Sequence, residues 1–147
     1  MSSASIKRII PCKKKQLIEM VLDIEKYPEF VPWCLEGKIH TKKESEDLIE
    51  IKADLKVGKK FFNETYSSLV LFHKKKDKIM VTNIDGPLKH LKNDWKFKEI
   101  NNSTQLEFNI DFELKNNLLN SIMKRSFDLG LNKIADAFEK RAIELFK

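Results

Sequence analysis

The sequence is poor in the residues that mark fibrous, disulfide-bonded or low-complexity chains. Four glycines and four prolines among 147 residues exclude collagen-like and Pro/Gly-rich disordered character. The two cysteines, Cys12 and Cys34, are too few for a disulfide framework or a zinc site of their own. No stretch of about 18 apolar residues is present, so no membrane-spanning helix is expected. The first eight residues resemble neither a secretory signal nor a transit peptide, which favours a cytoplasmic protein.

Arginine is also scarce. Arg8, Arg125 and Arg141 are the arginines among 28 basic residues, and lysines supply most of the net charge of +6. Because arginine is the preferred side chain for bidentate phosphate contacts, we expect no DNA partner. The lysines predict a diffusely basic surface. Such a surface attracts an anionic membrane or ribosomal RNA, and a plain solvated surface is the simpler interpretation.

The length allows one hydrophobic core, and we expect a single domain over residues 1–147. A short strand is predicted at Ser2–Ile10, where Pro11 stops it, and helical spacing follows over Lys14–Asp23. Two prolines within Asp23–Cys34 prevent one continuous helix, so a second short helix and a break follow.

From Lys38 to Lys115 apolar residues recur at every second position, which is typical of antiparallel strands with one wet face. Strands are predicted at Ile49–Val57, Phe61–Phe72, Ile79–Ile84, Leu91–Ile100 and Leu106–Leu114. Turns are expected at Val57–Lys59, His73–Asp77, Asp85–Pro87 and Asn101–Ser103.

The helical period returns at Asn117 and continues to the chain end. One apolar stripe contains Leu118, Leu119, Ile122, Met123, Phe127, Leu131, Ile134, Ala135, Phe138, Ala142 and Leu145. A helix of about 30 residues measures roughly 45 Å and is long enough to cover the apolar face of the sheet. The sequence therefore predicts an α+β helix-grip fold, in which a curved antiparallel sheet wraps around a long C-terminal helix, with two short helices as a lid. A large apolar ligand would lie between sheet and helix.

Residues for catalysis or metal binding are sparse. His40, His73 and His90 are isolated, and no nucleophile, phosphate-loop or metal-binding motif occurs. Cys34 follows Trp33, but the sequence shows no cationic setting that would ionise it, so a buried inert thiol is the simpler interpretation. We therefore expect no catalytic residue, no metal and no catalytic cofactor.

Asp23–Cys34, which reads D-I-E-K-Y-P-E-F-V-P-W-C, resembles the D-I-E-x-Y-P-E-F-[VL]-P-W-C segment of the coenzyme Q-binding family of START-like domains. Further matches in family order are Ile84–Leu91 with Trp95–Phe97, and Phe108–Leu119 with Ala137–Ala142. Together the matches cover nearly the whole chain. Two positions depart from the family pattern: Tyr66–Leu69 replaces an F-T-S-R segment, and Leu88 replaces a Phe.

The resemblance implies the helix-grip fold. It also implies that the protein binds ubiquinone or a related polyprenyl lipid and supports quinone delivery for respiration and ubiquinone biosynthesis. The same family includes ribosome-associated toxins of the RatA type, so binding to the large ribosomal subunit, which blocks subunit joining, is the first alternative. A polyketide cyclase or aromatase is the second. Transient contact with the inner-membrane surface would accompany the lipid-binding function.

Twelve side chains are expected to line the ligand cavity: Phe30, Val31, Trp33, Ile51, Tyr66, Leu91, Trp95, Phe97, Phe108, Phe112, Phe127 and Leu131. The candidate hydrogen-bond donors to the headgroup of the ligand are Tyr66, Ser67, Asn93 and Asp94. The proline-stiffened segment Tyr27–Trp33 is expected to act as a gate, with Lys13–Lys15 holding it against anionic lipid.

Overall fold

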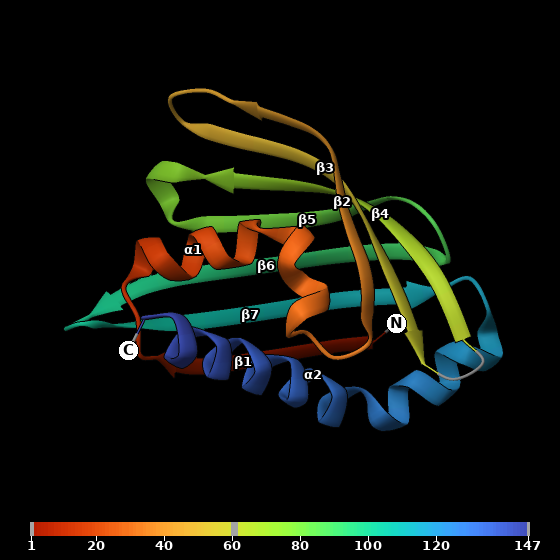
Figure 1. Ribbon diagram of the computed structural model, residues 1–147. Coiled ribbons are helices and arrows are strands. Elements are labelled where there is room, and N and C mark those ends of the chain that lie inside the picture. The colour runs from red at the N-terminus through yellow and green to blue at the C-terminus, as the bar shows by residue number, and fades with distance from the viewer. Residues whose placement is uncertain (1, 60–61, 147) are drawn as a thin grey trace.

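The computed structural model describes residues 2–59 and 62–146, without the side chains of residues 2, 59, 62, 119 and 122–126. Seven strands, two α-helices and two short 3-10 helices follow one another along the chain (Figure 1). They are β1 (Ser2–Ile10), α1 (Lys14–Leu22), η1 (Ile24–Glu29), β2 (Cys34–Glu44), β3 (Leu48–Lys59), β4 (Phe62–His73), η2 (Lys74–Lys76), β5 (Lys78–Asp85), β6 (Leu88–Ile100), β7 (Ser103–Leu114) and α2 (Asn117–Phe146).

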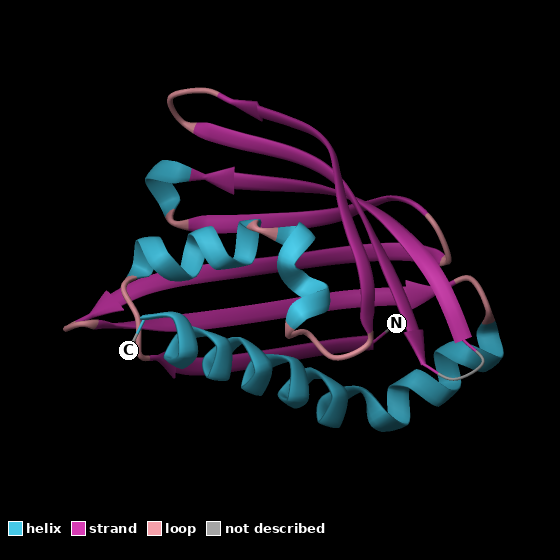
Figure 2. Cartoon of the chain, in the orientation of Figure 1, coloured by secondary structure: helices cyan, strands magenta, loops and turns pink. Residues whose placement is uncertain are grey.

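All seven strands form one antiparallel sheet in the order β1-β7-β6-β5-β4-β3-β2. The six strands β2 to β7 follow one another as a meander, and β1 closes the order by pairing with the last of them, from Ser2 opposite Phe112 to Ile10 opposite Thr104. The sheet is strongly curved, and α1, η1 and α2 lie on its concave side (Figure 2). The predicted helix-grip arrangement is confirmed.

Two predicted boundaries were wrong. Val57–Lys59 is not a turn, because β3 continues through it: Gly58 pairs with Asn63 and Lys59 pairs with Phe62. Residues 60–61 lie outside the described residues. β2 begins at Cys34 instead of Lys38. Register shifts between Cys34 and Glu36 and between Ile39 and Thr41 interrupt the two-residue repeat of β2, which explains why its beginning was not visible in the sequence.

The other predicted turns are confirmed. Gly86 has φ of +124° and its N–H donates a 2.9 Å hydrogen bond to the Asp85 carboxylate, so Asp85–Pro87 is a turn. Asp77 and Asn101 have φ of +49° and +55°, in the left-handed region that Asn and Asp tolerate better than most residues.

The interior divides into two apolar clusters. The main cluster lies under α1, η1 and the C-terminal half of α2 and contains Leu17, Ile51, Phe97, Phe138 and Ala142. A second cluster contains buried Leu88, Phe112 and Leu114, with half-buried Tyr66, Leu91, Ile110 and Phe127 packed against them.

The expected stripe of α2 is buried only in part. Leu131, Phe138 and Ala142 are buried, whereas Leu118 and Leu145 in its end turns are 71% and 51% exposed. Leu119, Ile122 and Met123 lie outside the described side chains. Within the part of the chain that is described, no helix has the length and apolar character needed to cross a membrane.

Two glycines provide opposite tests of this packing. A Cβ on Gly37 of β2 would lie 2.3 Å from the carbonyl oxygen of Ile24, which is backbone of η1. Gly37→Ala should therefore lower the free energy of unfolding by about 1–3 kcal/mol, because η1 must move away from β2. A Cβ on Gly130 of α2 would meet the Trp33 ring at an ordinary 3.7 Å.

Gly130→Ala should raise the free energy of unfolding by about 0.5–1 kcal/mol, since alanine is the better residue inside a helix. Urea denaturation followed by circular dichroism measures both variants. A neutral Gly37→Ala would contradict the close contact between η1 and β2.

Candidate functional site

The two-residue repeat of the strands decides which side chains face α2. One cross-strand row on the concave face runs through Phe72, Ile79, Trp95, Phe108 and Ile6. Side chains two positions further along each strand form parallel rows on the same face. Figure 1 shows α1 over one end of the sheet and the beginning of α2 at the opposite end.

The row that contains Trp95 is closely packed. The Trp95 ring meets Phe108 and Phe138 in edge-to-face contacts, with centroid distances of 4.7 and 5.5 Å. Its Nε1–H donates a 2.8 Å hydrogen bond to Asn93 Oδ1, and Asn93 Nδ2 donates to the carbonyl of Asn109 at 2.9 Å. Asn93 is thereby engaged on both sides of its amide and holds the Trp95 ring in place.

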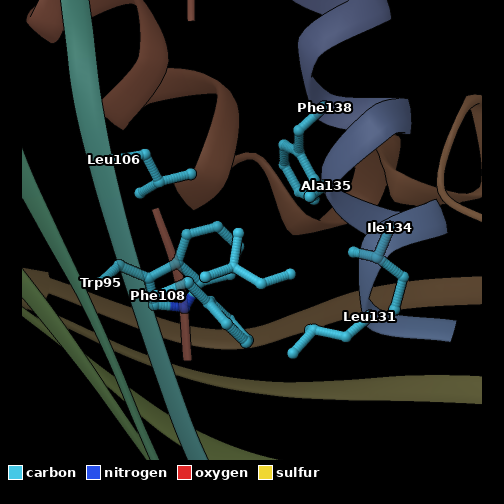
Figure 3. A pocket seen from close by; sticks show the side chains of 8 residues that line it. Trp95, Leu106, Phe108, Leu131, Ile134, Ala135 and Phe138 are labelled. Atoms are coloured by element: carbon cyan, nitrogen blue, oxygen red, sulfur yellow. The ribbon is translucent and has the colours of Figure 1, made fainter. Parts of the chain in front are cut away.

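A cavity of about 20 Å³ lies between this row and α2 (Figure 3). It is lined by Ile6, Trp95, Leu106, Phe108, Leu131, Ile134, Ala135 and Phe138. A volume of this size holds about one water molecule, and its lining is apolar throughout. This half of the interior, which we call the closed half, is already filled by the protein's own side chains.

The opposite half of the concave face is less covered. Leu55, Tyr66, Val81, Leu91 and Ile110 come from strands β3 to β7 and pack against the buried clusters, yet each stays half-buried. Phe127 of α2 meets Phe112 there with ring centroids 4.7 Å apart and is also half-buried. Large apolar side chains that face inward without being fully buried are what an apolar ligand would cover. We call this region the open half.

The segment predicted as a gate packs beside α2. The rings of Tyr27, Phe30 and Phe138 contact one another edge-to-face, with centroid distances between 5.1 and 6.0 Å. The Tyr27 hydroxyl donates to the carbonyl of Val21, and burial raises the pKa of this phenol. Trp33 has φ of +65° and its ring lies against Gly130. The segment thus spans the space between α1 and the middle of α2.

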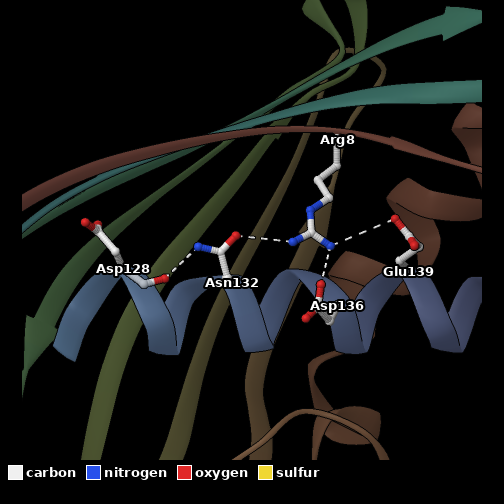
Figure 4. Close-up of polar contacts among 5 residues, drawn as sticks. All are labelled: Arg8, Asp128, Asn132, Asp136 and Glu139. Atoms are coloured by element: carbon white, nitrogen blue, oxygen red, sulfur yellow. Dashed lines mark hydrogen bonds and ion pairs between the residues drawn. The ribbon is translucent and has the colours of Figure 1, made fainter.

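Two arginines fix the C-terminal half of α2. From β1, Arg8 contacts Asp136, Asn132 Oδ1 at 3.3 Å and Glu139 at 3.9 Å (Figure 4). From α2, Arg141 donates a 2.6 Å hydrogen bond to Glu29 of η1 and covers the Phe30 ring at 5.1 Å. The hydrogen bond from Arg141 lowers the pKa of Glu29. These contacts hold the helix over the closed half.

The structure distributes the twelve predicted cavity residues among four places: the small cavity, the main cluster, the open half and the gate segment. Trp95, Phe108 and Leu131 line the small cavity. Ile51 and Phe97 are buried in the main cluster, with exposed fractions of 0% and 5%. The remaining residues belong to the open half or the gate segment: Tyr66, Leu91, Phe112 and Phe127, and Phe30, Val31 and Trp33. Phe138, predicted only as part of the apolar stripe of the helix, contacts both the gate and Trp95.

Of the four expected headgroup donors, Tyr66 alone is placed inward with a hydroxyl that makes no hydrogen bond within the described chain. Asn93 is buried, but its amide is already bonded. Asp94 points to the outer face, where it lies 3.7 Å from Lys78, and Ser67 donates a 2.6 Å hydrogen bond to Asp54 on that same face. For Asp94 and Ser67 the expectation was wrong, because each is one strand position out of phase with the inward row.

Lys13–Lys15 also lie elsewhere than expected. They begin α1, while the gate segment follows the end of that helix. Helix α1 is nine residues long, about 13.5 Å, and the lysines lie at the end away from the gate segment. Lys14 Nζ contacts Asp77 Oδ2 at 3.0 Å and thereby joins this end of α1 to η2. The lysines therefore cluster with Lys74–Lys76, at the end of the sheet away from the open half (Figure 1).

A hollow of about 340 Å³ on the outer face brings together His40, Asp54, Ser67 and Asp85. Asp54 receives hydrogen bonds from Ser67 at 2.6 Å and from His40 at 2.8 Å, and both lower the pKa of Asp54. The carboxylate lies between the histidine and the serine, whereas nucleophilic catalysis needs histidine next to serine. This arrangement therefore lacks the geometry of a catalytic triad.

Both cysteines are buried, as expected of inert thiols. Burial raises the pKa of Cys34 to about 11 and also raises the pKa of Cys12, so both thiols are protonated at neutral pH. Within the described residues, no group of three or more His, Cys, Asp or Glu side chains is placed to hold a metal ion.

Known proteins resemble the chain over most of its length. It is 34% identical over 143 residues to the ribosome association toxin RatA of Rickettsia prowazekii, covering 95% of each chain. It is 31% identical over 134 residues to the mitochondrial coenzyme Q-binding protein COQ10 of Dictyostelium discoideum, covering 89% of this chain and 64% of that one.

Solved structures agree on the fold. An 18 kDa protein from Caulobacter crescentus superimposes with a TM-score of 0.81 at 30% identity, covering 99% of this chain and 98% of the other. A START superfamily protein from Mycobacterium smegmatis gives 0.82 at 18% identity, covering 97% and 98%, and shares the fold. The family model described as polyketide cyclase / dehydrase and lipid transport matches residues 10–139. The chain therefore belongs to this START-like family.

Proposed function

We propose that the protein binds ubiquinone or a related polyprenyl lipid in the open half of its concave face and supports quinone delivery for respiration and ubiquinone biosynthesis. The observation that carries this proposal is the set of inward-facing apolar side chains that remain half-buried, among them Leu55, Leu91, Ile110 and Phe127. The name of the coenzyme Q-binding relative supports the choice of ligand.

The energetics favour a long apolar tail. Each CH₂ group that leaves water contributes about 0.8 kcal/mol, so a few isoprene units suffice for micromolar binding without any hydrogen bond. The closed half offers about 20 Å³, and the tail therefore lies in the open half under the N-terminal half of α2. That half of the helix presents Leu118 and Leu129, which are 71% and 64% exposed, and we place the transient membrane contact there.

The direct test is organic extraction of the protein purified from a host that contains ubiquinone, followed by mass spectrometry. We expect a polyprenyl quinone at a stoichiometric amount. Protein that carries no quinone after gentle purification, and takes up none from quinone-containing vesicles, would contradict the proposal.

A larger side chain that fills the open half should prevent the protein from retaining quinone. Leu91→Trp replaces a leucine side chain by an indole ring among Tyr66, Ile110 and Phe112, so we expect at least a tenfold lower content of extracted quinone. The matched control is Lys92→Trp, at the next position of β6, where the side chain is exposed. Equal quinone content in the two variants, both folded by circular dichroism, would place the ligand elsewhere.

Ribosome association is the second candidate function, and the lysine end of the molecule favours it. We use this name for Lys13–Lys15 and Lys74–Lys76, which the contact between Lys14 and Asp77 brings together. Lys74 and Lys75 are paired with Glu44 and Asp47. Lys13, Lys15 and Lys76 make no ion pair with a described residue and are exposed to solvent.

Exposed lysines grouped on one surface suit the phosphates of ribosomal RNA. The name of the ribosome association toxin RatA, to which the chain is similar, supports a ribosomal partner. We propose the large subunit, because a protein bound at the subunit interface would block subunit joining. This function involves a different part of the molecule from the open half.

The lysine end is tested by co-sedimentation with large ribosomal subunits between 50 and 200 mM salt. Log affinity falls with log salt, and replacement of Lys13, Lys15 and Lys76 by Gln should make this fall less steep by about two to three units of slope. Each lost phosphate contact removes about 0.7–0.9 from the steepness. The control replaces Lys38, Lys89 and Lys92, which are exposed outside the lysine end. If both triple variants lose binding equally, binding reflects overall charge.

A further inference from the structure

Two hydroxyl groups in the open half make no hydrogen bond to any described residue. Tyr66 packs against the second apolar cluster, and Ser68, two residues further along β4, lies on the same face between Tyr66 and buried Val70. Both side chains are half-buried, and neither hydroxyl makes a hydrogen bond within the described part of the chain.

The three uncharged polar side chains Asn83, Asn93 and Thr104 on this face have partners. Asn83, opposite Ser68, accepts a hydrogen bond from the N–H of Leu91 at 3.1 Å and donates to the carbonyl of Leu88 at 3.3 Å. Asn93 is bonded on both sides, and Thr104 donates to the carbonyl of Cys12 at 2.9 Å. Removing a hydroxyl from water without a new partner is unfavourable, so the unbonded pair points to a group that is supplied from outside.

We propose that Tyr66 and Ser68 donate hydrogen bonds to an uncharged ring that carries carbonyl groups, the headgroup of the lipid bound in the open half. This inference rests on the proposed lipid-binding function and adds the recognition of its headgroup. Residues two apart on a strand lie roughly 6.6 Å apart and point to the same face. Two such donors suit a ring with carbonyl oxygens on opposite sides.

The charges of the described residues around this pair favour an uncharged headgroup over a phosphate. Burial, followed by the nearby Glu64 carboxylate, raises the pKa of Tyr66, so the phenol stays a neutral donor. Glu64 lies two residues before Tyr66 and repels an anion. Phosphate sites in proteins use lysine or arginine, and Lys52 on neighbouring β3 is exposed and lines the hollow on the outer face.

The test compares two probes: a ubiquinone with a short isoprenoid tail, and an isoprenoid hydrocarbon of the same tail length without a ring. Binding of each is measured by quenching of tryptophan fluorescence or by equilibrium partitioning. Tyr66→Phe and Ser68→Ala should each weaken quinone binding roughly three- to tenfold, the loss of one hydrogen bond, and leave hydrocarbon binding within about twofold.

Ser67→Ala is the matched control, because Ser67 lies on the same strand with its hydroxyl bonded to Asp54 on the outer face. We expect it to bind both probes as the wild type does. Tyr66→Phe keeps the aromatic ring, and the urea midpoint of each variant confirms that folding is retained.

The outcomes separate the inference from the function on which it rests. Unchanged quinone binding in both variants, or equal losses for the two probes, would overturn the headgroup site. Wild-type protein that binds the hydrocarbon as tightly as the quinone would also overturn it, while the lipid-binding function stands. Wild-type protein that binds neither probe would overturn both.

Discussion

The packing of one long helix against one curved sheet determines how the interior is used. Arg8 from β1 and the pair of Arg141 with Glu29 hold the C-terminal half of α2 against the strands. Beneath that half, Trp95 and Phe138 fill the space and leave about 20 Å³. Because a rigid helix cannot follow the whole curvature of the sheet, close packing at one end leaves the concave face less covered at the other. The open half is therefore a consequence of how the closed half is fixed.

Under the proposed lipid-binding function, this division assigns stability and binding to different residues. Buried side chains such as Ile51 and Phe97 contact other buried groups on all sides, so their loss would be felt mainly in folding. Half-buried side chains such as Leu91 and Ile110 keep part of their apolar surface in contact with water. A tail that covers this surface gains free energy in proportion to the area, and such contacts are tolerant of tail length. Selectivity then depends on the few polar groups that face the ligand.

Strands with an unbroken two-residue repeat and the long helix were predictable, because one wet face leaves a clear pattern in β3 and β7. β2 was not, since its bulges shift the pattern. The phase of β4 was readable from Val70 and Phe72, which places Ser68 inward and Ser67 outward, but a serine carries no hydrophobic signal of its own. The difference between Phe97 in the core and Leu91 in the open half depends on where the helices cross the sheet, and no local pattern contains that information.

The same geometry bears on whether lipid binding and ribosome binding exclude each other. Between Tyr66 and His73, where η2 begins, β4 runs seven residues, about 23 Å, from the open half to the lysine end. Surfaces that far apart do not compete for the same contacts, so a bound lipid and a bound RNA are compatible on steric grounds.

Coupling between the two surfaces could pass through α1, which begins at the lysine end and leads through η1 into the gate segment. A shift of α1 on RNA would move Tyr27, whose hydroxyl is bonded to the carbonyl of Val21 at the end of that helix, and would thereby disturb its contact with Phe138. If both proposed functions hold, this path would link the binding of lipid to the binding of the ribosome.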